Sequence, residues 1–342
     1  MNFGMFTDFH VREHLSQAEA FDESFRQVEE AEKLGIDSVW LSEHHFSPER
    51  SVLASPLVIA SSLATRTQRV RIGLAVQVLP LTNPLRVAEE AATVDHISKG
   101  RFDFGVGRSG LTRYYQGYNV PYVESRSRFM EALEILTMAW KQEQFSYTGD
   151  HFSFQNVTVV PKPYQQPHPP IRVALASAET FALIGRLGYA IFISANTSIP
   201  QLQERLALYR QARAEAGHTG PADIALRIPA YVAETAQHAH DEPELSTMHA
   251  IRYAATELMA TAANPEVAAR MERTANTPYD DILKQRVLYG TPEAVVDRLQ
   301  MYQDTLGITG VVLEMNYGGR LPYERVINSV RLLTEHVAPR FK

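Results

Sequence analysis

The sequence predicts an α/β fold, a parallel (β/α)8 TIM barrel with insertions, and two observations support this prediction. First, one order of elements recurs at residues 34–42, 187–194 and 306–314: an amphipathic helix ends in Leu-Gly, and a short β-branched or aromatic run follows. Second, eight strand candidates alternate mostly with helices. Strands that are apolar throughout suit a closed parallel barrel better than an open sheet.

The individual elements follow from local signals. Glycine just past a helix C-terminus favours the left-handed conformation, which we expect at Gly35, Gly188 and Gly307. Asn83 as N-cap and Pro84 at the first position open another helix. Besides the three repeated runs, the first of which places a strand at residues 36–41, the expected strands are residues 2–6, 70–79, 101–107, 171–175 and 224–232.

We expect a single domain over residues 1–342 with two insertions. Residues 145–170, roughly, have the pattern of a hairpin followed by a proline-rich loop. Residues 242–284, roughly, have a helical pattern with little strand character. Neither segment has the composition of a linker between independent domains.

Composition and charge limit the classes of function. The chain has 342 residues, of which 45% are hydrophobic and 21% charged, an ordinary globular composition. A net charge of −6 without a lysine and arginine run argues against nucleic-acid and membrane partners and favours a small-molecule substrate. The absence of cysteine excludes disulfides and thiolate chemistry. With no pattern of a signal peptide or a membrane span, we expect a cytoplasmic enzyme.

Residues 105–110, Gly-Val-Gly-Arg-Ser-Gly, have the spacing of a dinucleotide-binding loop. Such a loop needs a helix directly after the glycines, and residues 111–122 show no helical apolar stripe. In a barrel, Gly105 and Gly107 would instead let the strand end approach a ligand, and Arg108 would project donors into the mouth at the carboxyl ends. Alternatively, the glycines relieve crowding and Arg108 pairs with a carboxylate. These residues alone leave both interpretations open.

Titratable residues follow two other strand ends. His44 and His45 come after residues 36–41, and only one of them would face the barrel axis if the strand continues. An imidazole there suits acid–base catalysis, whereas a histidine held by backbone groups in a loop is the alternative. Asp8 and His10 would line the same mouth or, with His44, bind a metal, for which the spacing is weak evidence.

Residues 175–180, Leu-Ala-Ser-Ala-Glu-Thr, precede a helix that we expect to be capped near Ser177. Exposed backbone N–H groups and the hydroxyls of Ser177 and Thr180 would bind an anion, although plain capping explains the same residues. An arginine combined with a helix N-terminus forms a phosphate site typical of barrels, which would give Arg108 and this helix a common ligand.

Six segments resemble, in collinear order, the bacterial luciferase-like flavin monooxygenases, and especially the α subunit of luciferase. They are EHHF (43–46), GLAVQVLPLTNPLRVAEE (73–90), DHISKGRFDFGVGR (95–108), PIRVALASAET (170–180), GTPEAVVDRL (290–299) and the closing SVRLLTEHVAPRF. The resemblance covers essentially the whole chain. It implies a (β/α)8 barrel that binds reduced FMN (FMNH2) from a separate flavin reductase. With dioxygen, this flavin would form a hydroperoxide that oxygenates a small organic substrate.

The resemblance also assigns roles to residues. His44 corresponds to the catalytic histidine, a base near the flavin. Ala75 and Val76 correspond to a bulged strand, often with a cis peptide, that presses on the isoalloxazine. The remaining cofactor-binding residues are Gly107 beside the flavin and, around the phosphate, Arg108, Ser177, the Ala178 backbone and Thr180. No metal is implied.

Departures from luciferase bear on the substrate. Gly107 stands in place of a reactive cysteine, Ala176 replaces a glutamate, and Ala195 falls about where luciferase has a tryptophan. These small residues enlarge the mouth, so we expect neither a long-chain aldehyde substrate nor light emission. Residues 263–285, roughly, match the mobile lid of luciferase but differ in composition. The expected substrate-binding residues are Phe6, Asp8, His45 and Ala195.

Two alternatives accompany this assignment. A deazaflavin-dependent oxidoreductase of the same superfamily would transfer hydride without oxygen. A non-catalytic luciferase-like subunit would keep the fold and lose site residues, which the retention of His44 and Arg108 argues against. Barrels of this family generally pair through helices in the first third of the chain, so we expect a homodimer.

Overall fold

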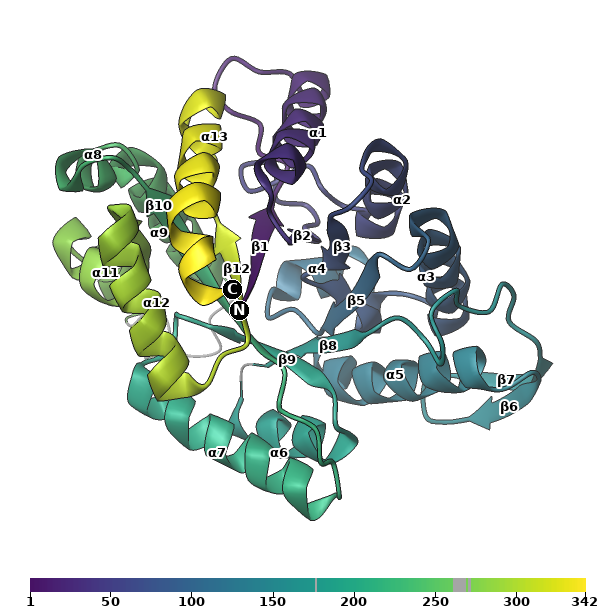
Figure 1. The fold of residues 1–342 in the computed structure, drawn as a ribbon. Coiled ribbons are helices and arrows are strands. Elements are labelled where there is room, and N and C mark those ends of the chain that lie inside the picture. The colour runs from purple at the N-terminus through teal and green to yellow at the C-terminus, as the bar shows by residue number, and fades with distance from the viewer. Residues whose placement is uncertain (176, 261–268, 270–271) are drawn as a thin grey trace. The chain divides into compact units, whose positions relative to one another are not determined.

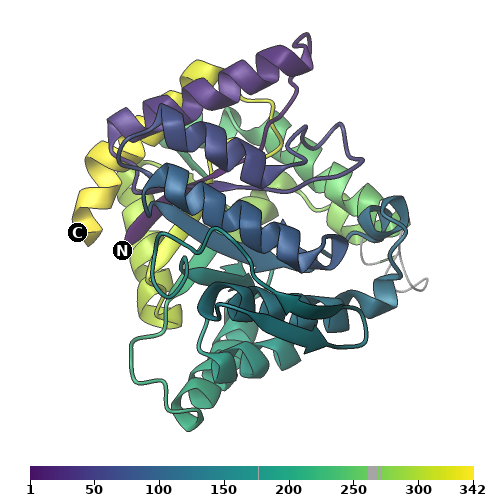
Figure 2. The same cartoon turned by 90° about the vertical axis from the view of Figure 1, so that its right-hand side faces the viewer.

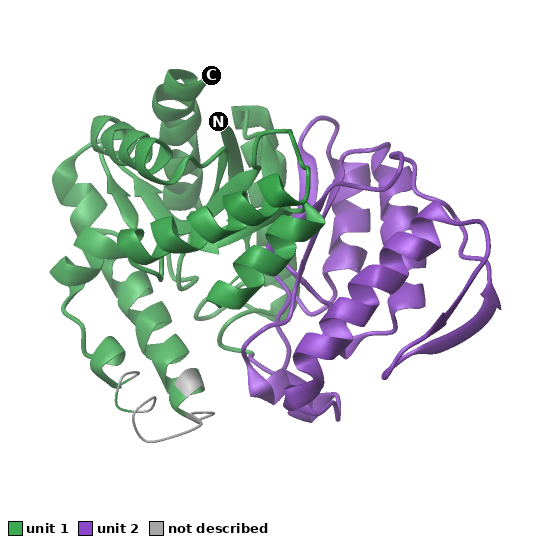
Figure 3. Cartoon of the chain, turned by 90° about the horizontal axis from the view of Figure 1, so that it is seen from below, with its two compact units in different colours: residues 1–40, 48–52, 175–342 green, residues 41–47, 53–174 purple. Residues whose placement is uncertain are grey.

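The computed structural model describes residues 1–175, 177–260, 269 and 272–342 (Figure 1). The chain divides into two compact units (Figure 3): residues 1–40, 48–52 and 175–342 form unit 1, and residues 41–47 and 53–174 form unit 2. Ala176 and part of the segment matched to the luciferase lid lie outside the described residues. The expectation of one domain over the whole chain stays a prediction.

Eight strands follow one another in the order β10-β12-β1-β2-β3-β5-β8-β9, and β9 pairs again with β10, so that the order closes on itself. The pairs β1–β12, β10–β12, β3–β5 and β5–β8 are parallel. These strands are β1 (Asn2–Thr7), β2 (Ser38–Leu41), β3 (Arg71–Leu74), β5 (Phe102–Gly107), β8 (Ile171–Ala174), β9 (Ala190–Ser194), β10 (Ile224–Val232) and β12 (Gly310–Glu314). The predicted (β/α)8 barrel is confirmed.

Unit 1 contains most of the helices. They are α1 (Gln17–Leu34), α6 (Ala178–Leu187), α7 (Ile199–Glu215), α8 (Ala236–Asp241), α9 (Glu244–Ala260), α11 (Tyr279–Gln285), α12 (Pro292–Leu306) and α13 (Tyr323–Leu332). The short strand β11 (Leu288–Gly290) pairs with β10 outside the closed order. The glycines that follow three of these helices confirm the predicted ends, with φ of 101° at Gly35, 78° at Gly188 and 61° at Gly307.

Unit 2 contains α2 (Pro56–Arg66), α3 (Pro84–Ser98), α4 (Thr112–Gly117) and α5 (Ser125–Lys141). The Asn83 side chain accepts from the N–H of Leu85 at 3.0 Å, which confirms the predicted cap. Helices α2 and α3 lie side by side in both views (Figures 1 and 2). The predicted strand over residues 70–79 is wrong in detail, because β3 and β4 (Gln77–Val78) are separated by Ala75 and Val76, which a cis peptide bond joins.

Both predicted insertions have the expected structure where it is described. Strands β6 (Phe145–Thr148) and β7 (Ser153–Val157) form the antiparallel hairpin, and the proline-rich loop follows. The second insertion is helical in α9 and α11. Within the described parts of the chain, no helix is both long and apolar enough to cross a membrane.

The inner face of the strands in unit 1 is recognised by its packing. A Cβ atom at Gly4 would lie 2.6 Å from the Trp40 ring, so β1 requires glycine here to approach β2. The Trp40 ring in turn packs edge-on against Phe192 of β9, with centroids 4.9 Å apart. Because side chains alternate along a strand, Phe6 lies on the same face of β1 as Gly4.

Candidate active site

His44 follows the end of β2 and is half-buried. Its Nδ1 atom lies 2.8 Å from the hydroxyl oxygen of Tyr114, a residue of α4 that is 1% exposed. A buried phenol at this distance holds the imidazole in one orientation and engages one ring nitrogen. This arrangement suits a residue that exchanges a proton at a fixed position.

His45 has a different environment. Its Nε2 atom lies 2.8 Å from the Glu43 carboxylate, and its Nδ1 atom lies 3.2 Å from the Tyr118 hydroxyl. The other oxygen of Glu43 accepts the backbone N–H of Val78 at 2.9 Å. Both ring nitrogens of the buried His45 therefore have partners within unit 2. Its role as a substrate-binding residue stays a prediction.

The structure brings Val76 and Gly107 together. Strand β4 pairs with β5 so that Val78 lies opposite Gly107. A Cβ atom built on Gly107 would lie only 2.5 Å from Cγ2 of Val76, a distance that real Cβ atoms essentially never show. Glycine at this position therefore lets β5 approach the segment of Ala75 and Val76, to which the resemblance assigns contact with the isoalloxazine.

Arg108 directly follows β5 and donates from Nη1 to the Ser125 hydroxyl at 3.1 Å. Its carbonyl oxygen accepts from the hydroxyl of Tyr115, and burial raises the pKa of that phenol to about 12. Within the described residues, no carboxylate forms an ion pair with Arg108. The interpretation of Arg108 as the partner of a neighbouring carboxylate is therefore not supported.

The expectation that no helix follows the glycines is wrong. Helix α4 begins at Thr112, because Tyr114 and Tyr115 both become buried in unit 2. It has six residues, and the Leu111 side chain provides no cap. The sequence signal was weak because an aromatic pair within so short a helix produces no apolar stripe.

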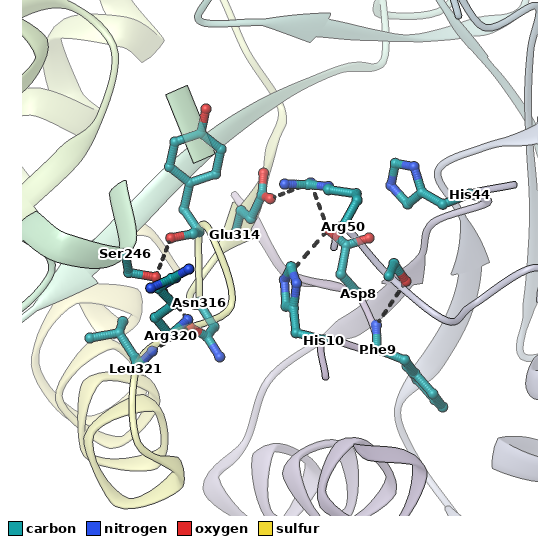
Figure 4. A network of polar contacts seen from close by, with 12 residues as sticks. Asp8, Phe9, His10, His44, Arg50, Ser246, Glu314, Asn316, Arg320 and Leu321 are labelled. Atoms are coloured by element: carbon teal, nitrogen blue, oxygen red, sulfur yellow. Dashed lines mark hydrogen bonds and ion pairs between the residues drawn. The ribbon is translucent and has the colours of Figure 1, made fainter. Parts of the chain in front are cut away.

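In unit 1, the first strand leads into a buried cluster of charges (Figure 4). One nitrogen of Arg50 lies 2.6 Å from the Asp8 carboxylate and 2.7 Å from that of Glu314. His10 lies 3.7 Å from Asp8, and burial lowers the pKa of its imidazole although the Asp8 charge opposes this effect. Asp8, predicted as a substrate-binding residue, is thus already held by Arg50.

The predicted helix start at Ser177 is confirmed as the N-cap of α6. The Thr180 hydroxyl donates to the Ser177 carbonyl at 2.6 Å, and the Ser177 side chain caps no backbone N–H group. Ser177 and Ala178 are exposed. Elsewhere in unit 1, Ala195 follows β9 and is 8% exposed, and its backbone N–H donates to the Arg227 carbonyl at 3.2 Å.

Sequence reasoning missed Glu43, Tyr114, Arg50 and Arg227. An available signal was the arginine within the otherwise apolar run IALRIPAYV of β10, since a charge inside a buried strand needs a partner or a function. The contact of Tyr114 with His44 joins residues 70 positions apart, so it was not readable locally. In the part of the chain that the structure describes, no three His, Asp or Glu side chains are grouped to hold a metal ion.

Comparison with known proteins decides the family. The sequence model described as luciferase-like monooxygenase matches residues 1–309. The chain belongs to the luciferase-like monooxygenase family. The resemblance seen in the six sequence segments is therefore confirmed at the level of the family, while the roles of single residues stay predictions.

Curated relatives of this chain include enzymes with different substrates in their names. Limonene 1,2-monooxygenase of Rhodococcus erythropolis is 27% identical over 326 residues, 94% of this chain and 82% of the relative. The oxygenase component of flavin-dependent trigonelline monooxygenase from Acinetobacter baylyi is 25% identical over 355 residues, 100% and 96% of the two chains. Two uncharacterized proteins of Sinorhizobium fredii are 36% and 34% identical, but the alignments span only 52% of each relative's length.

Solved structures agree with the fold of this chain. Monooxygenase RslO1 from Streptomyces bottropensis superposes with a TM-score of 0.87 and 28% identity, and 100% of each chain is covered. An F420-dependent secondary alcohol dehydrogenase superposes with a TM-score of 0.77 and 19% identity, covering 98% of each chain. The second likeness shows the shared fold alone.

Proposed function

We propose that this chain is a monooxygenase that uses FMNH2 and dioxygen to transfer one oxygen atom to a small organic substrate. The observation that carries the proposal is the family match over residues 1–309. The relative named as an oxygenase component supports a separate flavin reductase as the source of reduced flavin. When bound, reduced flavin supplies the two electrons with which dioxygen yields an oxygenated product and water.

Several side chains of unit 2 fit a flavin. Glycine at position 107 lets Val76, which the resemblance places against the isoalloxazine, pack directly against β5. Because no carboxylate of the described residues pairs with Arg108, its guanidinium is available to a phosphate without the loss of an ion pair. In unit 1, the Ser177 and Thr180 hydroxyls and the Ala178 N–H at the start of α6 have the chemistry of phosphate ligands.

His44 acts in this proposal by holding and moving a proton at its imidazole. The Tyr114 hydroxyl, 2.8 Å from Nδ1, fixes the ring, because it can either donate to this nitrogen or accept a hydrogen bond from it. Phe6, Asp8, His45 and Ala195 remain the proposed substrate-binding residues. Small, apolar or buried side chains among them would exclude water from the reacting atoms.

Fluorescence titration with FMN and FMNH2 tests the cofactor assignment. Wild-type protein is expected to bind FMN, and R108M is expected to bind it more weakly, because a charge-assisted contact to phosphate is lost. R325M, which changes an exposed arginine of α13, serves as the control. Absence of binding to the flavin in both redox states, or unchanged affinity in R108M, would contradict these assignments.

Oxygen consumption with FMNH2 tests the reaction class. The proposed enzyme reduces dioxygen and oxygenates its substrate, whereas a deazaflavin-dependent oxidoreductase or a non-catalytic subunit does not. H44A is expected to lower oxygenation by about 100-fold, which is the smaller end of the contribution of a general acid or base. Its affinity for FMN should stay close to that of the wild type, which separates the proton step from binding.

We also propose a homodimer that pairs through α2 and α3. A groove on these helices is lined by Leu57, Val58 and Val94 together with charged residues, and Val58 is 68% exposed. An apolar side chain this exposed is well suited to an interface. V58D is expected to shift the mass in light scattering from dimer to monomer, and a wild-type monomer would contradict the proposal.

A further inference from the structure

The inner face of β10 carries an arginine. In the register of unit 1, Arg227 lies opposite Val312 of β12, which lies opposite Gly4 of β1. The guanidinium carbon lies 3.9 Å from the centroid of the Phe6 ring, and Nη2 donates to Glu314 at 2.8 Å. Phe6 and Glu314 are each two residues beyond these register partners, so the Arg227 side chain extends towards the carboxyl ends of the strands.

A second arginine in the same cluster has a structural role. Arg50 binds the Asp8 and Glu314 carboxylates, and its side chain is only 14% exposed. The Asp8 side chain is 1% exposed and that of Glu314 is 4% exposed. Two buried carboxylates thus face two guanidinium groups, so the cluster carries no uncompensated negative charge that would repel an anion.

Arg227 is more exposed than Arg50, which is enclosed between its two carboxylate partners. Its side chain is 34% exposed, and Glu314 is its one carboxylate partner among the described residues. Nη1 has no hydrogen-bond partner within the described parts of the chain, and the guanidinium lies over the Phe6 ring, which restricts its movement. Ala195, which directly follows the neighbouring strand β9, has a small side chain, and its N–H donates to the Arg227 carbonyl. Phe6 and Ala195 are both predicted substrate-binding residues.

We propose that Arg227 binds a carboxylate of the substrate, so that the enzyme acts on small organic acids. A planar guanidinium with a free donor, held over an aromatic ring, matches the geometry of a carboxylate and is poorly matched to a hydrocarbon. This inference rests on the proposed function for the reaction itself. It adds the chemical class of the substrate and a residue that determines specificity.

Calorimetric titration without flavin tests the inference with two pairs of probes, benzoate against benzamide and hexanoate against hexanamide. Each amide has the shape of its acid and lacks the charge. Wild-type protein is expected to bind each acid at least about tenfold more tightly than its amide, equivalent to about 1.4 kcal/mol. R227M should lose this preference, and R227K should retain part of it because the charge remains.

The control is R331M on α13, because Arg331 has a similar exposure of 39% and an ion pair of the same 2.8 Å length with Glu335. It should keep the full preference for acids. The inference would be overturned if the wild type bound acid and amide equally, or if R227M kept the preference for acids. It would also be overturned if no acid bound at about 10 mM, a concentration at which even a Kd of about 1 mM is detected. Since no flavin is present, FMN titration of the wild type reports separately on the proposed function.

Discussion

Replacement of Gly107 by alanine is the most direct perturbation of the proposed flavin site. The new Cβ would lie 2.5 Å from Cγ2 of Val76, whereas carbon atoms in contact are about 3.5–4.0 Å apart. The two segments must therefore separate by about 1 Å. Overpacking of this kind costs about 1–3 kcal/mol of unfolding free energy. The segment that moves is the one proposed to contact the isoalloxazine, so we also expect weaker FMN binding.

The assay combines urea unfolding with fluorescence titration by FMN. G110A is the matched control, because a Cβ on Gly110 would meet nothing within 4 Å although the residue lies in the same glycine segment. V76A removes the clashing methyl group, so the double variant G107A/V76A should recover much of the FMN affinity that G107A loses. Wild-type stability and affinity in G107A, or a double variant no better than G107A, would refute the reasoning.

Three further predictions follow from other contacts. Y114F removes the hydroxyl that orients His44, so oxygenation should fall about tenfold while FMN affinity stays unchanged. Oxygenation at the wild-type rate would exclude a positioning role for Tyr114. Burial lowers the pKa of His10 in the folded state, so the unfolded state takes up its proton first as the pH decreases through about 6.5. The free energy of unfolding should therefore decrease as the pH decreases through this range. The free energy of unfolding of H10Q should depend less on pH between about 7.5 and 5.5 than that of the wild type, and parallel curves would contradict the assignment. N83A removes the cap of α3 and should cost about 0.5–2 kcal/mol in urea unfolding, with N83D as a control that keeps a capping oxygen.

Most of the fold was predictable because its signals are local. Gly35, Gly188 and Gly307 end their helices in the left-handed conformation, and Asn83 caps α3, as the sequence indicates. Each of these residues acts on its own turn, so no knowledge of distant neighbours is needed. The strand over residues 70–79 failed for the opposite reason. An apolar run shows that a segment is buried, but it does not show where the pairing of that segment with β5 changes.

The site was only partly predictable, because its residues are defined by contacts across the chain. His44, after the end of β2, and Gly107, the last residue of β5, are assigned to the proposed site from these positions and from the family resemblance. Tyr114 was missed because nothing in residues 111–117 indicates that its hydroxyl reaches an imidazole 70 positions away. Arg50 was missed because it lies in a loop and becomes essential only once Asp8 and Glu314 are adjacent.

Arg227 shows how a position in the barrel determines what a residue can do. One residue earlier or later in β10, the same side chain would point to the opposite face, because side chains alternate along a strand. On the inner face it meets Phe6 and Glu314, which arrive from β1 and β12. These contacts leave the Nη1 atom of Arg227 without a partner among the described residues on a side chain that is 34% exposed, whereas the Arg50 side chain is 14% exposed and joins two buried carboxylates. The two arginines of this cluster therefore have different roles in the proposal. Arg50 joins the carboxylates of Asp8 and Glu314, and Arg227 is available to bind a ligand.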